Sequence, residues 1–168
     1  MTSHTHALER VRTFLHAMTL LLFLGTIGEL IAVKHYGEAT KLVPFARCVL
    51  GCVALAAAWL RPGRCVFLAI RAFMVVTMFG SLLGVYEHIQ GNLETSREIH
   101  KHLATTARIK AALSGADPIA APGTLAVAAL LLIAATFVSQ ALAGPDADRD
   151  DAGAVAWKPT PLRTPRSA

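Results

Sequence analysis

Residues 119–142 read IAAPGTLAVAALLLIAATFVSQAL, an apolar stretch that contains no charged side chain. A helix needs about 20 apolar residues to cross the hydrocarbon core of a bilayer, and this stretch is long enough. Three further apolar runs precede it, at residues 13–33, 43–60 and 65–87. The sequence therefore predicts an all-α membrane bundle of four transmembrane helices.

The composition supports a lipid environment. Hydrophobic residues make up 54% of the chain and charged residues 16%, whereas soluble domains average about 25% charged residues. The net charge is +5, and the basic side chains lie mostly between the apolar runs, where they anchor to lipid headgroups. No basic stripe is interleaved with aromatic residues, as a nucleic-acid groove requires. We expect the lipid bilayer, and no nucleic acid, as a partner.

The two ends of the chain differ from this transmembrane domain, which spans residues 13–142. The first apolar run is too long for the apolar region of a signal peptide, about 7–15 residues, and no A-x-A cleavage site follows it. We therefore expect an uncleaved helix after a mobile N-terminus at residues 1–12. Residues 143–168 are rich in proline, small residues and charges, which predicts a disordered tail.

Four crossings place both termini on the same side of the membrane. The short turn at residues 61–64 contains two arginines, and Arg10 and Arg12 precede the first helix. Short basic loops stay in the cytoplasm, so the sequence predicts that both termini are cytoplasmic.

The loop before the last helix contains a helix signal of its own. Thr95 and Glu98 have the spacing of a capping box, and Ile99, Leu103 and Leu113 share one helical face. This pattern predicts a short amphipathic helix at about residues 96–113, lying on the membrane or on the mouth of the bundle.

Ionisable side chains gather near the outer ends of the helices, where burial in lipid makes them functional suspects. Glu29 and Arg47 each lie four residues from the outer end of their helices, about 6 Å deep at about 1.5 Å per residue. Because the first two helices form a hairpin, we expect these residues to pair. Other candidates for a binding cluster at this outer mouth are Tyr86, Glu87, His88 and His35. The pair fits a structural role as well as a functional one.

Small residues recur at helical spacing and predict contacts between helices. Gly80 and Gly84 form a small-xxx-small pair that permits close approach of two backbones. Gly51 and Gly25 lie on similar stripes of the second and first helices. We expect all four glycines at packing faces.

Metal binding is left open by the sequence. Glu98 and His102 are one helical turn apart, and His88 precedes them. A site needs three or four ligands, and a solvated helix face is the simpler explanation of the Glu98–His102 spacing. We expect no cofactor.

Residues 86–94, which read YEHIQGNLE, resemble a pattern in small uncharacterised bacterial four-helix integral membrane proteins. The resemblance covers residues 80–125 and includes the Asp117-Pro118 and Ala121-Pro122-Gly123 segments. It implies a multi-pass protein of the bacterial plasma (inner) membrane, and it implies no reaction.

Three functions fit the sequence. The first is a non-enzymatic accessory or interaction protein, since the chain has no Walker loop, nucleophile elbow or HExxH motif. It would work with a second copy of itself or with another membrane protein. The second is a haem- or metal-binding redox module, and the third is an oligomeric carrier of a small solute or ion that uses Glu29.

Overall fold

The structure is a computed structural model that describes residues 2–34, 37, 39–61, 63–99, 104–113 and 120–143. These residues form helices and no strand. The elements are α1 (Thr2–Ala32), the 3-10 helix η1 (Ala39–Leu42), α2 (Val43–Leu60), α3 (Arg64–Ile99), α4 (Thr105–Leu113) and α5 (Ala120–Ala143). Four helices, α1, α2, α3 and α5, are long and apolar enough to cross a membrane. The predictions of an all-helical fold and of four helices with the length and apolar composition of membrane spans are confirmed for the described residues.

Helix α5 is the centre of the bundle, and both α1 and α3 make their main contacts with it. Its buried face is dominated by small side chains, which let neighbouring backbones approach closely. The buried alanines of this face are Ala121, Ala126, Ala128, Ala129 and Ala135. The small side chains of α5 therefore allow α1 and α3 to pack closely against it.

The two helices that pack on α5 present similar seams. Their buried residues alternate at spacings of three and four, as in helices that cross at a shallow angle. On α3 these residues are Phe67, Ile70, Met74, Thr77 and Ser81. On α1 they are His16, Thr19, Phe23, Thr26 and Leu30. Both seams mix large apolar side chains with hydroxyl groups.

Helix α2 joins the bundle through glycine contacts. A Cβ atom at Gly51 would lie 2.7 Å from Cε1 of Phe23 on α1, too close for any residue larger than glycine without a shift of the ring. At Gly84 of α3 a Cβ would lie 3.4 Å from Cβ of Pro122 on α5, an ordinary contact. At Gly25 a Cβ would meet nothing within 4 Å, so the packing role expected for Gly25 is not found.

Two predicted helix boundaries differ from the structure. Helix α1 begins at Thr2, so residues 2–12 are helical, and their expected mobility stays a prediction. Ala7, Leu8 and Glu9 favour helix, and His6 Nδ1 lies 3.6 Å from Glu9 Oε2. These local preferences extend the helix beyond the apolar run.

Helix α3 continues to Ile99, well past the predicted end at residue 87. Residues 88–99 contain no proline, and although Gly91-Asn92 is a turn-type dipeptide, Asn92 and Ser96 are buried in this extension, beside which α4 packs. Thr95 is therefore inside a helix and caps none. One amphipathic helix over residues 96–113 stays a prediction, because residues 96–99 belong to α3 and residues 100–103 lie outside the described ranges. The predicted tail beyond Ala143 lies outside them as well.

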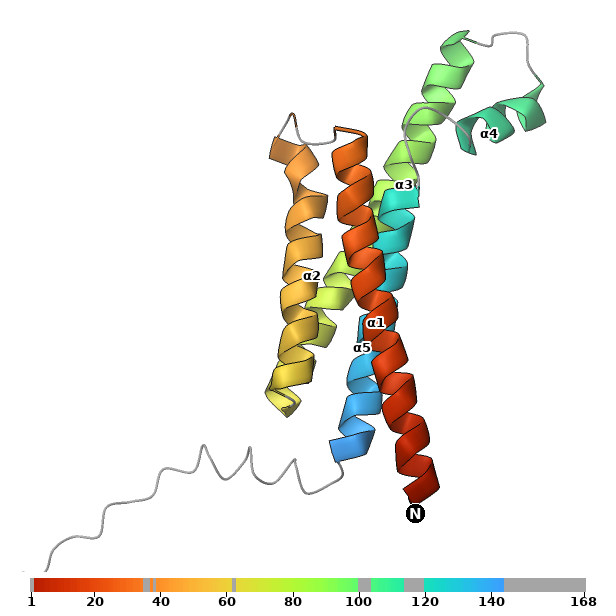
Figure 1. Cartoon of the computed structure of the whole chain (residues 1–168). Helices are drawn as coiled ribbons and strands as arrows, with labels where there is room; N and C mark the ends of the chain where they lie inside the picture. The colour runs from red at the N-terminus through yellow and green to blue at the C-terminus, as the bar shows by residue number, and fades with distance from the viewer. Residues whose placement is uncertain are drawn as a thin grey trace, which may run out of the picture.

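Figure 1 shows the N-terminus, the turn between α2 and α3, and the last turn of α5 at one end of the bundle. We call this the inner end. The connection from α1 to α2, the extension of α3 and the start of α5 lie at the opposite end, which we call the outer end. The described ends of the chain thus lie on the same side, as four crossings require.

The Gly51 contact generates a stability prediction with a built-in control. Gly51→Ala should destabilise the protein by about 1–3 kcal/mol, because the added methyl group overpacks the contact with Phe23. Gly25→Ala should be neutral or stabilising by up to about 1 kcal/mol, because it adds helix propensity in open space. Thermal melting of both purified variants in detergent measures the difference, and equal melting temperatures would contradict the α1–α2 contact.

Candidate functional site

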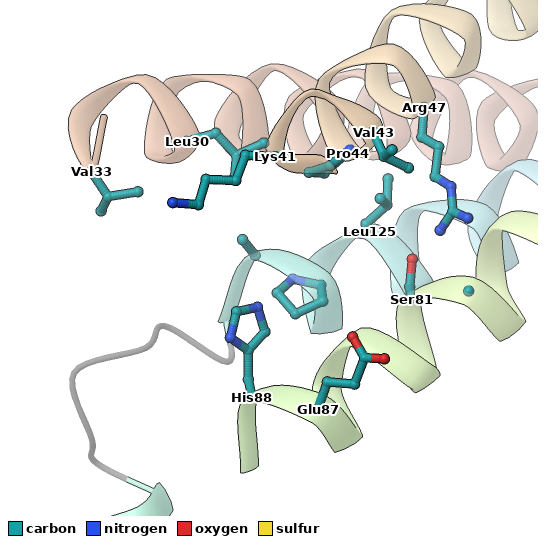
Figure 2. A pocket seen from close by; sticks show the side chains of 13 residues that line it. Leu30, Val33, Lys41, Val43, Pro44, Arg47, Ser81, Glu87, His88 and Leu125 are labelled. Atoms are coloured by element: carbon teal, nitrogen blue, oxygen red, sulfur yellow. The ribbon is translucent and has the colours of Figure 1, made fainter. Parts of the chain in front are cut away.

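A cavity of about 380 Å³ opens at the outer end, between α1, η1 and α2 on one side and α3 and α5 on the other. Figure 2 shows its lining side chains. Its volume falls within the range of about 300–1,000 Å³ that is usual for small-molecule sites. The cavity combines an apolar part, which includes Leu30, Val43 and Leu125, with the polar side chains described next.

Arg47 extends from α2 across the cavity to the backbone of α3 at Gly80. A Cβ atom at Gly80 would lie 2.7 Å from Cζ of Arg47, so the absent side chain makes room for the guanidinium. Arg47 is half-buried. Among the described residues no hydrogen bond or ion pair satisfies its guanidinium, which carries five N–H donors.

The opposite wall belongs to α3 and carries Ser81, Glu87 and His88. Ser81 is 2% exposed, and its hydroxyl has no hydrogen-bond partner within the part of the chain that the structure describes. Glu87 is exposed and His88 is half-buried. Lys41, from η1, lines the cavity on the same side as Arg47 (Figure 2). Basic groups therefore face a carboxylate across the cavity.

The structure brings together only part of the predicted outer cluster. Arg47, Glu87 and His88 line the cavity, whereas Glu29 and Tyr86 do not. No ion pair within 4.0 Å joins the described residues Glu29 and Arg47, so the predicted pair is not formed. The reason is that Arg47 turns away from α1 to lie over α3.

Two further residues of the predicted outer cluster, Tyr86 and His35, are not found in the cavity lining of the described residues. The exposed Tyr86 accepts a hydrogen bond from Nε2 of Gln90 through its hydroxyl oxygen, at 3.1 Å. His35 lies outside the described residues. Sequence reasoning missed Lys41 and Ser81 as cavity residues, although Ser81 continues the helical stripe of Thr77 and Lys41 lies two residues before the second apolar run.

The metal candidates do not assemble within the described ranges. His88 and Glu98 are described, whereas His102 is not. No group of three or more His, Cys, Asp or Glu side chains that could hold a metal ion occurs among the residues described. A metal site with His102 therefore stays a prediction.

A second polar cluster lies at the inner end, around Arg71 of α3. Arg71 donates from Nε to Oγ1 of Thr136 and from Nη2 to Oε1 of Gln140, both at 2.8 Å. Its guanidinium also lies 3.7 Å above the centre of the Phe137 ring. All three partners lie in the last two turns of α5, and Gln140 is in the last turn, where the helix dipole favours a cation. This arrangement ties α3 to α5.

His16 and Trp59 close the inner end between α1 and α2. The ring of His16 donates from Nδ1 to the carbonyl oxygen of Arg12 at 2.8 Å, and it meets the Trp59 ring edge to face at 5.1 Å. The guanidinium of Arg12 lies 5.0 Å from the centre of the same ring. These contacts are aromatic and cation–π packing, which fits a structural role.

Comparison with known proteins finds no match among protein-family models, curated proteins or solved structures. The cavity is therefore interpreted from its own geometry.

The cluster around Arg71 predicts a measurable coupling across α3 and α5. In a double-mutant cycle of Arg71→Gln and Gln140→Leu, the coupling free energy should be about 0.6 kcal/mol, the average for polar contacts between membrane helices, and at most about 1.7 kcal/mol. Detergent unfolding of the two single variants and the double variant gives this value. Strict additivity of the two substitutions would show that the hydrogen bond does not stabilise the bundle.

Proposed function

We propose that the protein is a non-enzymatic accessory or interaction protein of the membrane, which binds an anionic group of its ligand in the outer cavity. The observation that carries this proposal is the guanidinium of Arg47. It is half-buried, lies against the backbone at Gly80, and has no partner among the described residues.

The chemistry of the cavity favours an anion. An arginine in a membrane helix is costly unless a polar group satisfies it, and the planar guanidinium matches a phosphate or carboxylate through two parallel hydrogen bonds. Lys41 adds a positive charge on the same side, and His88 and Ser81 can donate further hydrogen bonds. These groups would hold a phosphate or carboxylate in a fixed orientation.

Binding explains these side chains more simply than catalysis. A serine nucleophile needs a base within hydrogen-bond reach, and the hydroxyl of Ser81 has no such partner within the described ranges. The arrangement is one of charges around a cavity, which is sufficient for recognition.

The same proposal includes the cellular setting. The resemblance of residues 80–125 supports a bacterial inner-membrane protein, and the partner would be a second copy or another membrane protein. The shared side of the two described chain ends (Figure 1) and the arginines of the turn at residues 61–64 support cytoplasmic termini.

Orientation can be tested with reporter fusions. A reporter active only in the cytoplasm should be active when fused after residue 143, and a periplasm-only reporter should be inactive there. Insertion of the same reporters between α1 and α2 should give the reverse pattern. Periplasmic activity at the C-terminal fusion would invert the assignment and place the cavity on the cytoplasmic side.

Anion binding predicts a specific effect of Arg47. Short-chain phosphatidylglycerol, which is anionic, should raise the melting temperature of the wild-type protein in neutral detergent. Arg47→Gln should weaken this binding roughly tenfold or more, because hydrogen bonds to charged groups contribute about 1.5–3 kcal/mol. Gly80→Ala should weaken it too, because its methyl group displaces the guanidinium. The melting curves at a series of lipid concentrations measure both effects.

Arg97→Gln is the matched control, because Arg97 is an exposed arginine of α3 that does not line the cavity. It should bind as the wild type does. If Arg47→Gln also bound like the wild type, the proposed function would be rejected. A haem absorption band in the purified protein would instead favour the redox alternative.

A further inference from the structure

We infer that the ligand of the outer cavity is a zwitterion with a phosphate and a primary ammonium group, as in the phosphoethanolamine headgroup of a phospholipid. This inference rests on the proposed function and names the ligand class of the same site. It assigns the phosphate to Arg47 and the ammonium group to Glu87.

The first argument is the separation of opposite charges. Arg47 comes from α2 and Glu87 from α3, and Figure 2 shows both reaching toward the space between the helices. Both residues are described, and no ion pair within 4.0 Å joins them. A plain anion would satisfy Arg47 and leave the carboxylate of Glu87 beside a negative ligand. A ligand that carries both charges can pair with Arg47 and with Glu87 at the same time.

The second argument concerns the phosphate end. Ser81 follows Gly80, on which the guanidinium of Arg47 lies, and Figure 2 shows the Ser81 hydroxyl directed toward the Arg47 side of the cavity. This hydroxyl is buried without a partner among the described residues. A phosphate held by Arg47 offers oxygen acceptors that the hydroxyl can use, which removes the cost of a buried unsatisfied donor.

The third argument concerns the ammonium end. Quaternary ammonium groups are recognised by the faces of aromatic rings, and none of the described residues that line the cavity is Phe, Tyr or Trp. A primary ammonium group instead donates N–H hydrogen bonds to a carboxylate. Glu87 at the rim of the cavity therefore favours ethanolamine over choline.

The position of the cavity points to a lipid as the source of this zwitterion. Arg47 lies four residues after the start of α2 at Val43, which is about 6 Å along the helix at about 1.5 Å per residue. Since the 18 residues of α2 are about as long as the hydrocarbon core is thick, Arg47 would lie about one helical turn below the headgroups, and its long side chain can reach toward a lipid phosphate. Apolar side chains of the lining, among them Leu30, Val33 and Leu125, would contact the acyl part of the lipid.

The test compares three short-chain phospholipids that share the same acyl chains: phosphatidylethanolamine, phosphatidylglycerol and phosphatidylcholine. Melting in neutral detergent gives the affinity of the full-length protein for each. The wild type should prefer phosphatidylethanolamine to both others. Glu87→Gln should lower the affinity for phosphatidylethanolamine roughly tenfold and leave or improve that for phosphatidylglycerol. Glu94→Gln, an exposed carboxylate of α3 outside the lining, should change neither.

Each outcome decides between the claims. If Arg47→Gln loses binding but Glu87→Gln keeps the wild-type lipid preference, the zwitterion is rejected and the anion site stands. If Arg47→Gln loses nothing, the proposed function itself fails. Phosphatidylcholine bound as tightly as phosphatidylethanolamine would reject the primary ammonium group. If free O-phosphoethanolamine raised the melting temperature as much as phosphatidylethanolamine does, the zwitterion would stand and a lipid as its source would be rejected. Melting without lipid shows that each variant is folded.

Discussion

The contact of the alanine face of α5 with α1 and α3 is the interaction on which the rest of the bundle depends. Between helices in a bilayer the hydrophobic effect is weak, so association relies on close packing and polar contacts. Small side chains on α5 provide close packing on two sides. Helix α2 is enclosed less, and its contacts are local ones, Gly51 against Phe23 and Arg47 over Gly80.

This unequal packing explains where the cavity lies. Helices α3 and α5 meet at Gly84 and Pro122, in the first turn of α5, while α1 and α2 meet at Phe23 and Gly51, about two turns into α2. At the outer end, between these two contacts, the side chain of Arg47 crosses from α2 to Gly80 of α3 and lines the cavity. A cavity with charged walls follows from the same geometry that builds the core.

The helix class and the membrane spans could be predicted because hydropathy is a local property of each segment. The pairing of Glu29 with Arg47 could not, because it depends on the rotation of each helix about its own axis. The sequence gives the depth of each residue along its helix, but it does not show which neighbouring helix the residue faces, and Arg47 faces α3. Helix rotation also explains why Gly51 and Gly25 differ. Both lie on a stripe of small residues, but only Gly51 faces a side chain of a neighbouring helix, that of Phe23. The length of α3 was missed because Gly91-Asn92 and the capping-box spacing of Thr95 and Glu98 locally favour a break. The burial of Asn92 and Ser96 in the continuous helix is a tertiary contact that the local pattern does not show.

Comparison of the two arginines distinguishes a structural role from a binding role. Arg71 is satisfied by the protein itself, with two hydrogen bonds and an aromatic face on α5. Arg47 is the same residue type in a neighbouring helix, yet no described side chain accepts its hydrogen bonds. Some buried hydroxyls, such as those of Thr19 and Ser139, donate to backbone carbonyls of their own helices. Others have no partner among the described residues, namely those of Thr26, Thr77, Ser81 and Ser96. What distinguishes Ser81 is its place in the cavity lining beside Arg47, so a ligand with acceptor oxygens could accept hydrogen bonds from both side chains at that end of the bundle.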